Sequence, residues 1–293
     1  MSETKKQHYV PQFYLRNFGD RLYGYDKTDG TIFATTPKDI CFEKFFYCKP
    51  SDKGTSIEDG LSRLESRFAE TCRHIIENKK LTSLSTDDRN FFMLFVASQL
   101  LRTKERRIDV EQTSQAILDF VTNQMGITDW RATMKPEAIQ ALHNSHLVER
   151  AGEIAAIIAS NLKPIVFINK TRSPFWTSDN PIAKHNDINS WPYGNLGIAC
   201  RGIQLHFPLS PKVLIMLVDR REYHYLPEDN VVNVTDRMNV VFENNLQITS
   251  STRFIYSSDN IFRLANQYLQ EFPRFKDPDR ERFSSNLPFP PTS

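Results

Sequence analysis

The chain has 293 residues, of which 40% are hydrophobic, 12% aromatic and 25% charged, so its composition excludes a low-complexity or disordered protein. The net charge of +2 lacks the basic excess that strong nonspecific nucleic-acid binders carry. The longest apolar run, Val213–Val218, is far too short to span a bilayer, and residues 1–30 lack an apolar signal core. We therefore expect a cytoplasmic protein without a membrane partner.

The cysteine pattern and the absence of three common motifs narrow the function further. The four cysteines, Cys41, Cys48, Cys72 and Cys200, form no CxxC pair, and no pair of histidines accompanies them at the spacing of a zinc site. This pattern argues against a structural zinc site or a disulfide framework. The sequence also has no nucleotide-binding loop and no nucleophile elbow. The function must therefore be sought in other polar segments.

The N-terminal part predicts one short helix and several strands. Pro11 suits the first turn of a helix over Pro11–Asn17, and Gly19 would end it. Two apolar runs flank a turn-forming segment, which predicts a hairpin in which Gly30 supplies the turn conformation. The strands predicted here are Leu22–Tyr25, Thr31–Thr35 and Phe42–Cys48.

The centre of the chain, residues 56–161, is predicted to be helical. Ser56 offers a capped start for the first helix. A second start at Ser85 precedes a helix from about Arg89, which either continues to about Gln124 or breaks on the way. The third helix covers Pro136–Asn161. It carries His143 on its apolar stripe, which favours a core histidine over a metal ligand.

After Pro164 the pattern changes to short strands, and then to helices that close the fold. The predicted strands are Ile165–Asn169, Phe175–Thr177, Gly202–Phe207, Val213–Val218 and Phe254–Ser257, with Phe207–Pro211 as a turn. The predicted helices are Asp236–Ser250 and Asn260–Glu271. The fold class is α+β, with a mixed or antiparallel sheet that draws strands from both ends of the chain. We expect one composite domain over residues 1–272 and a poorly ordered tail over 273–293.

The first polar segment is residues 7–18. A helix that begins at Pro11 places Gln12 and Arg16 one turn apart on one face, with His8 just before them. A histidine beside a glutamine and an arginine could act as an acid or base next to an anion clamp. The alternative is structural: Gln12 and Arg16 satisfy buried backbone groups, and His8 caps the helix.

The second polar segment places Gln99, Arg102 and Arg106 on one helical stripe. A buried arginine needs a carboxylate or phosphate partner, because burial of an unpaired charge is unfavourable. The stripe is therefore either part of an anion site or a salt-bridged helix face, for which Glu105 and Asp109 could supply the carboxylates.

The third polar segment, Thr177–Pro181, is a tight loop that follows an aromatic strand. Pro181 restricts Asn180 to extended or turn geometry. Asp179 could be a general base or a metal ligand, and loops that leave a sheet often carry such groups. The alternative is an Asx-type turn, in which Asp179 and Asn180 bond only their own backbone.

These residues also carry a family resemblance. Residues 8–18 (HYVPQFYLRNF) resemble the opening signature of the bacterial domain-of-unknown-function family DUF4238. The likeness continues through QLLRT (99–103), TSDNP (177–181), FPLSP (207–211), Asn245 and RFIY (253–256). One departure is Lys104, where the family more often has proline. The resemblance implies that the three segments belong to one folded unit, and it transfers no activity, cofactor or catalytic residue.

Two functional hypotheses follow. In the first, the protein is a hydrolase of a phosphodiester, RNase-like, in bacterial conflict or phage defence, and a divalent metal is a compatible cofactor. His8 is the general acid/base and Asp179 a base or metal ligand, while the phosphate is held or oriented by Arg16, Arg102, Gln12, Gln99 and Asn180. In the second, a non-catalytic module binds or senses an anionic small molecule or a protein partner. A purely structural polar core is the remaining option.

Overall fold

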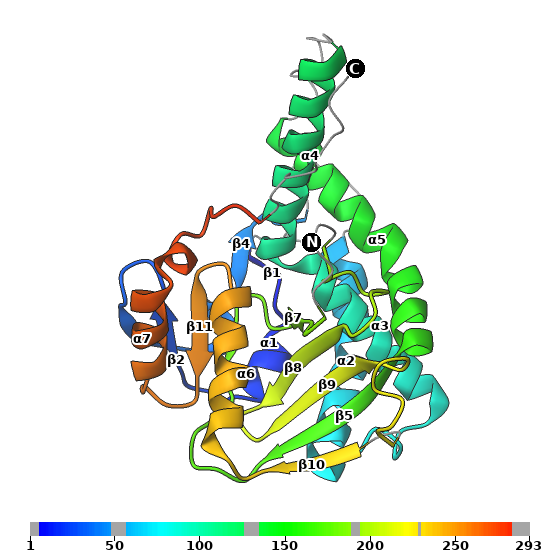
Figure 1. The fold of residues 1–293 in the computed structure, drawn as a ribbon, viewed down its shortest axis with the longest axis vertical. Helices are drawn as coiled ribbons and strands as arrows, with labels where there is room; N and C mark the ends of the chain where they lie inside the picture. Colours follow the sequence, from blue (N-terminus) through cyan, green and yellow to red (C-terminus); the bar gives the residue numbers. More distant parts are fainter. Residues whose placement is uncertain (1–5, 48–56, 126–134, 189–193, 228–229, 283–293) are drawn as a thin grey trace.

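The computed structural model describes residues 6–47, 57–125, 135–188, 194–227 and 230–282 (Figure 1). Its helices are α1 (Gln12–Arg16), α2 (Ile57–Asn78), α3 (Thr86–Arg102), α4 (Lys104–Met125), α5 (Pro136–Asn161), α6 (Arg237–Ser250) and α7 (Arg263–Glu271). The first strands are β1 (Lys6–His8), β2 (Leu22–Asp26), β3 (Ile32–Thr35), β4 (Phe42–Lys44), β5 (Leu162–Asn169) and β6 (Thr177–Ser178). They are followed by β7 (Ala183–His185), β8 (Gln204–Ser210), β9 (Val213–Asp219), β10 (Asn230–Val234) and β11 (Phe254–Ser257). The α+β class is confirmed.

The larger sheet has the strand order β10-β5-β9-β8-β7, in which β10 runs parallel to β5 and the other neighbours are antiparallel. Strands β5, β8 and β9 are buried along nearly their whole length, because helices cover both faces of the sheet. Helices α2 and α5 contact the sheet on one side, whereas α6 contacts it through β7 and β10. The outer parts of α4 and α5 project away from this body (Figure 1).

The smaller sheet has the order β3-β2-β11-β6 and is antiparallel throughout. It joins the N-terminal hairpin to strands from the C-terminal half of the chain, as the sequence predicts. Gly30 has φ of 81° in the hairpin turn, the left-handed conformation that the predicted turn requires of a glycine. The larger sheet differs from the prediction, because it is built from residues 162–234 alone. A two-stranded pair of β1 and β4 completes the strands of the described residues.

The long central helix breaks at Thr103, which separates α3 from α4. Thr103 has an extended backbone, with φ of −77° and ψ of 159°, and its Oγ1 accepts a hydrogen bond from the amide of Arg106. It therefore ends one helix and caps the next. The predicted start at Ser85 is confirmed, because its Oγ accepts a bond from the amide of Asp88.

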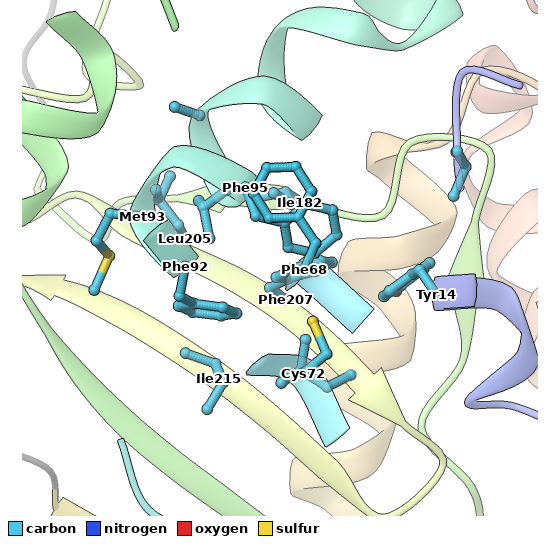
Figure 2. Packing of buried hydrophobic residues seen from close by; sticks show 14 of the residues in the cluster. Tyr14, Phe68, Cys72, Phe92, Met93, Phe95, Ile182, Leu205, Phe207 and Ile215 are labelled. Atoms are coloured by element: carbon cyan, nitrogen blue, oxygen red, sulfur yellow. The ribbon is translucent and has the colours of Figure 1, made fainter. Parts of the chain in front are cut away.

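The main core lies between the helices and the larger sheet (Figure 2). Phe68 of α2 and Phe92 and Phe95 of α3 pack over β8 and β9, where they meet Phe207 and Ile215. Helix α1 joins this core through Tyr14, whose ring stacks on Phe207. The Tyr14 hydroxyl donates to the carbonyl of Pro208 at 2.6 Å and lies 2.8 Å from Thr177 Oγ1. One side chain thus connects both large sheets.

Three local expectations need correction. Strand β4 ends at Lys44 rather than extending toward Cys48, which lies outside the described residues together with the helix start at Ser56. The segment Phe207–Ser210 belongs to β8, where a register irregularity accommodates Pro208. The segment 273–282 is ordered, because Arg280 and Arg282 both form ion pairs with Glu105, whereas 283–293 lie outside the description. Among the helices of the described ranges, none has the length and apolar character to cross a bilayer.

Candidate functional site

The N-terminal segment brings three of the predicted site residues together. His8 ends β1, and Pro11 precedes α1. Arg16 donates from Nη2 to Oε1 of Gln12 at 3.0 Å, and Nε2 of Gln12 lies 3.5 Å from Nδ1 of His8. The side chain of Gln12 therefore lies between the imidazole and the guanidinium.

These three side chains line a cavity of about 500 Å³, called the His8 hollow below. Its opposite wall is the first half of α2, which contributes polar and acidic groups. The lining residues are His8, Gln12, Phe13, Arg16, Asp59, Ser62, Glu65, Ser66 and Ala69. The hollow therefore combines one arginine, one histidine and two carboxylates.

His8 is uncharged at neutral pH. Its side chain is 8% exposed, and burial lowers its pKa to about 4, with the positive charge of Arg102 acting in the same direction. Nε2 has no hydrogen-bond partner among the described residues. The ring of Phe42 lies beside it at 5.4 Å between centroids. The structure therefore supplies a neutral imidazole at the inner wall of the hollow.

The second polar segment braces the first. Arg102 is 1% exposed and donates to the carbonyl of His8 at 2.6 Å and to the hydroxyl of Tyr47 at 3.2 Å. Its Nη2 lies 3.5 Å from a carboxylate oxygen of Glu65. Gln99, also buried, donates to the carbonyl of Tyr9 at 3.1 Å. These contacts fix the backbone around His8 and leave Gln99 and Arg102 behind the hollow rather than in it.

Asp179 has a structural environment. It is 1% exposed, and its carboxylate accepts three backbone N–H groups, from Thr252 and Arg253 at 2.8 Å and from Phe254 at 2.9 Å. Burial raises its pKa, and the bonds from the backbone act against that rise. Asp179 does not line the His8 hollow. Because both of its carboxylate oxygens accept backbone hydrogen bonds and solvent is excluded, its surroundings favour the structural alternative over the predicted catalytic role.

Asn180 borders a different cavity, of about 420 Å³, between the start of α4 and the end of α6. Its Nδ2 donates to the carbonyl of Ser250 at 2.9 Å. The charged residues of this second cavity are Glu105, Arg106, Asp109, Lys184 and Arg282. Four of these form the ion pairs Arg106–Asp109 and Arg282–Glu105. The three polar segments are therefore neighbours in one folded unit, but they do not open into one hollow.

The sequence reasoning missed a buried network around His206. Nδ1 of His206 lies 2.8 Å from a carboxylate oxygen of Glu243, and Nε2 lies 3.0 Å from Oε1 of Gln204. Gln204 in turn donates from Nε2 to Asp187, which also contacts His185 at 2.8 Å. Both ring nitrogens of His206 thus face acceptors. The alternation of Gln204 and His206 along β8 places them on one face, and this was the available signal.

Metal-ligating groups do not gather in the described part of the chain: no three His, Cys, Asp or Glu side chains lie close enough to hold an ion. His143 is fully buried against Phe46, as expected for a core histidine.

No curated protein and no solved structure matches the chain. The model of a family described as a protein of unknown function (DUF4238) matches residues 6–260. That span contains every residue of the His8 hollow, and the chain belongs to this family.

Proposed function

We propose that the His8 hollow binds a phosphate ester that carries free hydroxyl groups, of the ribose phosphate class. The observation that supports this proposal is the arrangement of Arg16 opposite the carboxylates of Asp59 and Glu65 in one cavity. A guanidinium pairs with phosphate oxygens through two parallel bonds. Carboxylates accept hydrogen bonds from sugar hydroxyls, as they do in dinucleotide-binding sites.

The charge balance of the hollow favours such a mixed ligand over a simple anion. Its lining has one arginine and two carboxylates, and Arg102 lies behind it at 3.5 Å from Glu65, so the hollow has no excess of positive charge to hold a bare dianion. A ligand with phosphate at one end and hydroxyl donors at the other satisfies both walls. Gln12, which already bonds Arg16, can donate or accept at the middle of the ligand.

Hydrolysis of a phosphodiester is the catalytic form of this proposal, with His8 as the proton acceptor. The lowered pKa of about 4 keeps His8 unprotonated at neutral pH, so its ring nitrogen is free to accept a proton, and it also makes the imidazole a weaker base than an ordinary histidine. In an RNase-like reaction it would take the proton of a 2′-hydroxyl, whose oxygen then bonds phosphorus as the P–O5′ bond breaks. The leaving O5′ would take its proton from water, and the hydroxide so formed would take the proton held by His8. The product of this step is a 2′,3′-cyclic phosphate, which a second water would open to complete the hydrolysis. This form uses His8 as the base in place of Asp179.

The binding step is tested by titrating the protein with ribose 5-phosphate and with short oligoribonucleotides, and following thermal stability and calorimetric heat. The variant Arg16→Gln should weaken binding by about tenfold, the usual effect of one charge-assisted contact. The exposed Arg21→Gln variant removes the same charge outside the hollow and should bind as the wild type does. Equal affinities in all three proteins would contradict the proposal.

The catalytic form is tested separately with His8→Gln. Because binding rests on Arg16 and the acidic wall, this variant should keep oligonucleotide affinity and lose cleavage. In bacterial cells it should also lose any growth inhibition or phage protection that the wild type confers. A protein that binds the ligand, is stabilised by it and leaves it intact would establish the non-catalytic binding module instead.

The setting of this activity is also part of the proposal. The described cysteines Cys41, Cys72 and Cys200 are free thiols, and the first two are buried. Free thiols persist in a reducing compartment. We place the protein in the cytoplasm, where phosphorylated ribose compounds and RNA are abundant.

A further inference from the structure

A separate cavity of about 400 Å³ lies where α6 and α7 begin, beside the loop that follows β5. Three arginines from these three elements meet at it: Arg172 from the loop, Arg237 from α6 and Arg263 from α7. None of them belongs to the His8 hollow or to the polar segments that the sequence singles out.

The three arginines have no partner within the described residues. All three are exposed, and no ion pair or hydrogen bond joins Arg172, Arg237 or Arg263 to another described group. Some other exposed arginines of the described ranges are paired, as in Arg67–Asp88 and Arg201–Glu222, whereas exposed arginines such as Arg73 stand unpaired but alone; what distinguishes this cavity is that three meet at it. Three positive charges at one cavity outnumber the single carboxylate of its lining, so an anion in the cavity would be stabilised by the excess positive charge.

Two nearby acidic groups, Asp236 and Asp259, accept hydrogen bonds from groups other than the arginines. Asp236 caps α6 by accepting a bond from the amide of Met238 at 2.8 Å. Asp259, the acidic residue of the cavity lining, accepts bonds from the hydroxyl of Ser257 and from the amide of Ile261, both at 3.2 Å. Neither carboxylate contacts an arginine of the cluster, so the positive charges remain available to a ligand.

Two of the arginines lie at the N-termini of helices, which adds to the positive potential of the cavity. Arg237 and Arg263 are the first residues of α6 and α7, where the helix dipole already contributes positive potential. Neither helix has an acidic residue in its first turn. Cations at this position oppose the dipole, which is the reverse of the usual preference. Asp236 already caps α6, so a multivalent anion would mainly offset the mutual repulsion of the arginines and the dipole of α7, whose N-cap Phe262 has no side-chain cap.

Half of the lining is apolar, beside the polar Ser173, Asn244 and Gln267, which favours an anion with an organic body. Trp176, Val240, Val241 and Leu264 line the cavity, together with Met238 and Ile261, which are 64% and 67% exposed. A volume of this size with apolar walls and a few charged groups is typical of small-molecule sites. We propose that this cavity, the arginine cavity, binds a nucleoside di- or triphosphate, with the phosphates on the three arginines and the base against the apolar wall.

The experiment compares ADP, pyrophosphate and adenosine in calorimetric titrations of the full chain, up to about 5 mM ligand. ADP should bind with the highest affinity, pyrophosphate more weakly, and adenosine not measurably, because the charged and apolar parts act together. Arg237→Gln and Arg263→Gln should each weaken ADP binding by about tenfold. The affinity should fall as salt rises.

Matched controls make the result specific to the cavity. Arg73→Gln removes an exposed arginine of α2 outside all three cavities and should leave ADP affinity unchanged. Arg16→Gln, which tests the His8 hollow, should also leave it unchanged, so the two proposals can fail independently. Absence of saturable ADP binding, or equal loss in Arg73→Gln and Arg237→Gln, would overturn the proposal. Preference for single-stranded DNA over ADP at the same arginines would overturn it too.

Discussion

His143 illustrates how a buried histidine links stability to pH. It is fully buried, and burial lowers its pKa to about 4 from 6.5, against the opposite effect of a hydrogen bond to the Leu101 backbone. Between pH 6.5 and pH 4 the unfolded chain binds a proton at this position and the folded protein does not. The free energy of unfolding should therefore fall as pH drops through this range.

We expect His143→Leu to remove up to about 3 kcal/mol of this acid sensitivity, the equivalent of the pKa shift. Stability at neutral pH should be retained, because a buried, poorly hydrogen-bonded ring is replaced by an apolar side chain of similar size. Urea unfolding at a series of pH values measures the effect. The exposed His224→Leu is the control; an acid limb that is equally steep in the wild type and in His143→Leu would contradict the assignment.

Asp179 should be needed for folding rather than for chemistry. Replacement by Asn keeps the shape but places an amide donor against one of three backbone donors. We expect a loss of about 3 kcal/mol in unfolding free energy, because bonds to a charged acceptor are strong and their loss leaves buried N–H groups unsatisfied. Asp20→Asn, at an exposed position, is the control. A stable Asp179→Asn protein that has lost its activity would restore Asp179 to a catalytic role.

The sequence predicts contacts between residues that are close along the chain better than contacts between distant ones. The helix that begins after Pro11 predicts the proximity of Gln12 and Arg16, because the two are four positions apart, about one helical turn. The partners of Asp179 could not be predicted, because they lie 73 to 75 residues away along the chain. Local spacing carries the first kind of information, and only tertiary structure carries the second.

At the scale of elements, periodic segments are predicted most accurately. Helix α5 has the predicted bounds, Pro136–Asn161, and β11 the predicted Phe254–Ser257. Short edge strands such as β7 and β10 have no distinct pattern of their own and were not predicted. The composition of residues 273–293 predicts a poorly ordered tail, whereas the described part, 273–282, is held by two arginines that reach back to Glu105.

That contact predicts a role for the C-terminal segment in holding α4 against α6. Glu105 accepts bonds from Arg280 at 2.9 Å, from Arg282 at 2.8 Å and from the hydroxyl of Thr252 at 2.7 Å. All three charged side chains are largely buried. Glu105→Gln should therefore lower the unfolding free energy by about 3 kcal/mol, because two buried guanidinium groups lose their counter-charge.

A chain that ends at Lys276 lacks both arginines and provides the matching experiment. The effects of this truncation and of Glu105→Gln should not add, since they remove the same interaction. Glu111→Gln, at an exposed position farther along α4, should have little effect. Additive effects of the truncation and Glu105→Gln in denaturant titrations would show that the segment contributes nothing through Glu105.

At the scale of the molecule, the two large sheets are joined by specific buried contacts. Tyr14 bonds both Thr177 of the smaller sheet and Pro208 of the larger sheet. Lys27, in the turn that follows β2, is fully buried and donates to the carbonyls of Ile248 and Ser251, at the end of α6. Because α6 also packs on the larger sheet, neither sheet can separate from the other without breaking buried hydrogen bonds.

We therefore expect residues 6–282 to unfold as one cooperative unit, which is the single-domain prediction in measurable form. Tryptophan fluorescence and far-UV circular dichroism should give coincident urea transitions. Tyr14→Phe should lower stability by about 1–2 kcal/mol, because it removes the hydroxyl that bonds both sheets, and should leave the two transitions coincident. Tyr225→Phe removes an exposed hydroxyl and should change neither. Two separated transitions in the wild type would mean that the sheets belong to independently folding halves, and that the contacts of Tyr14 and Lys27 are too weak to couple them.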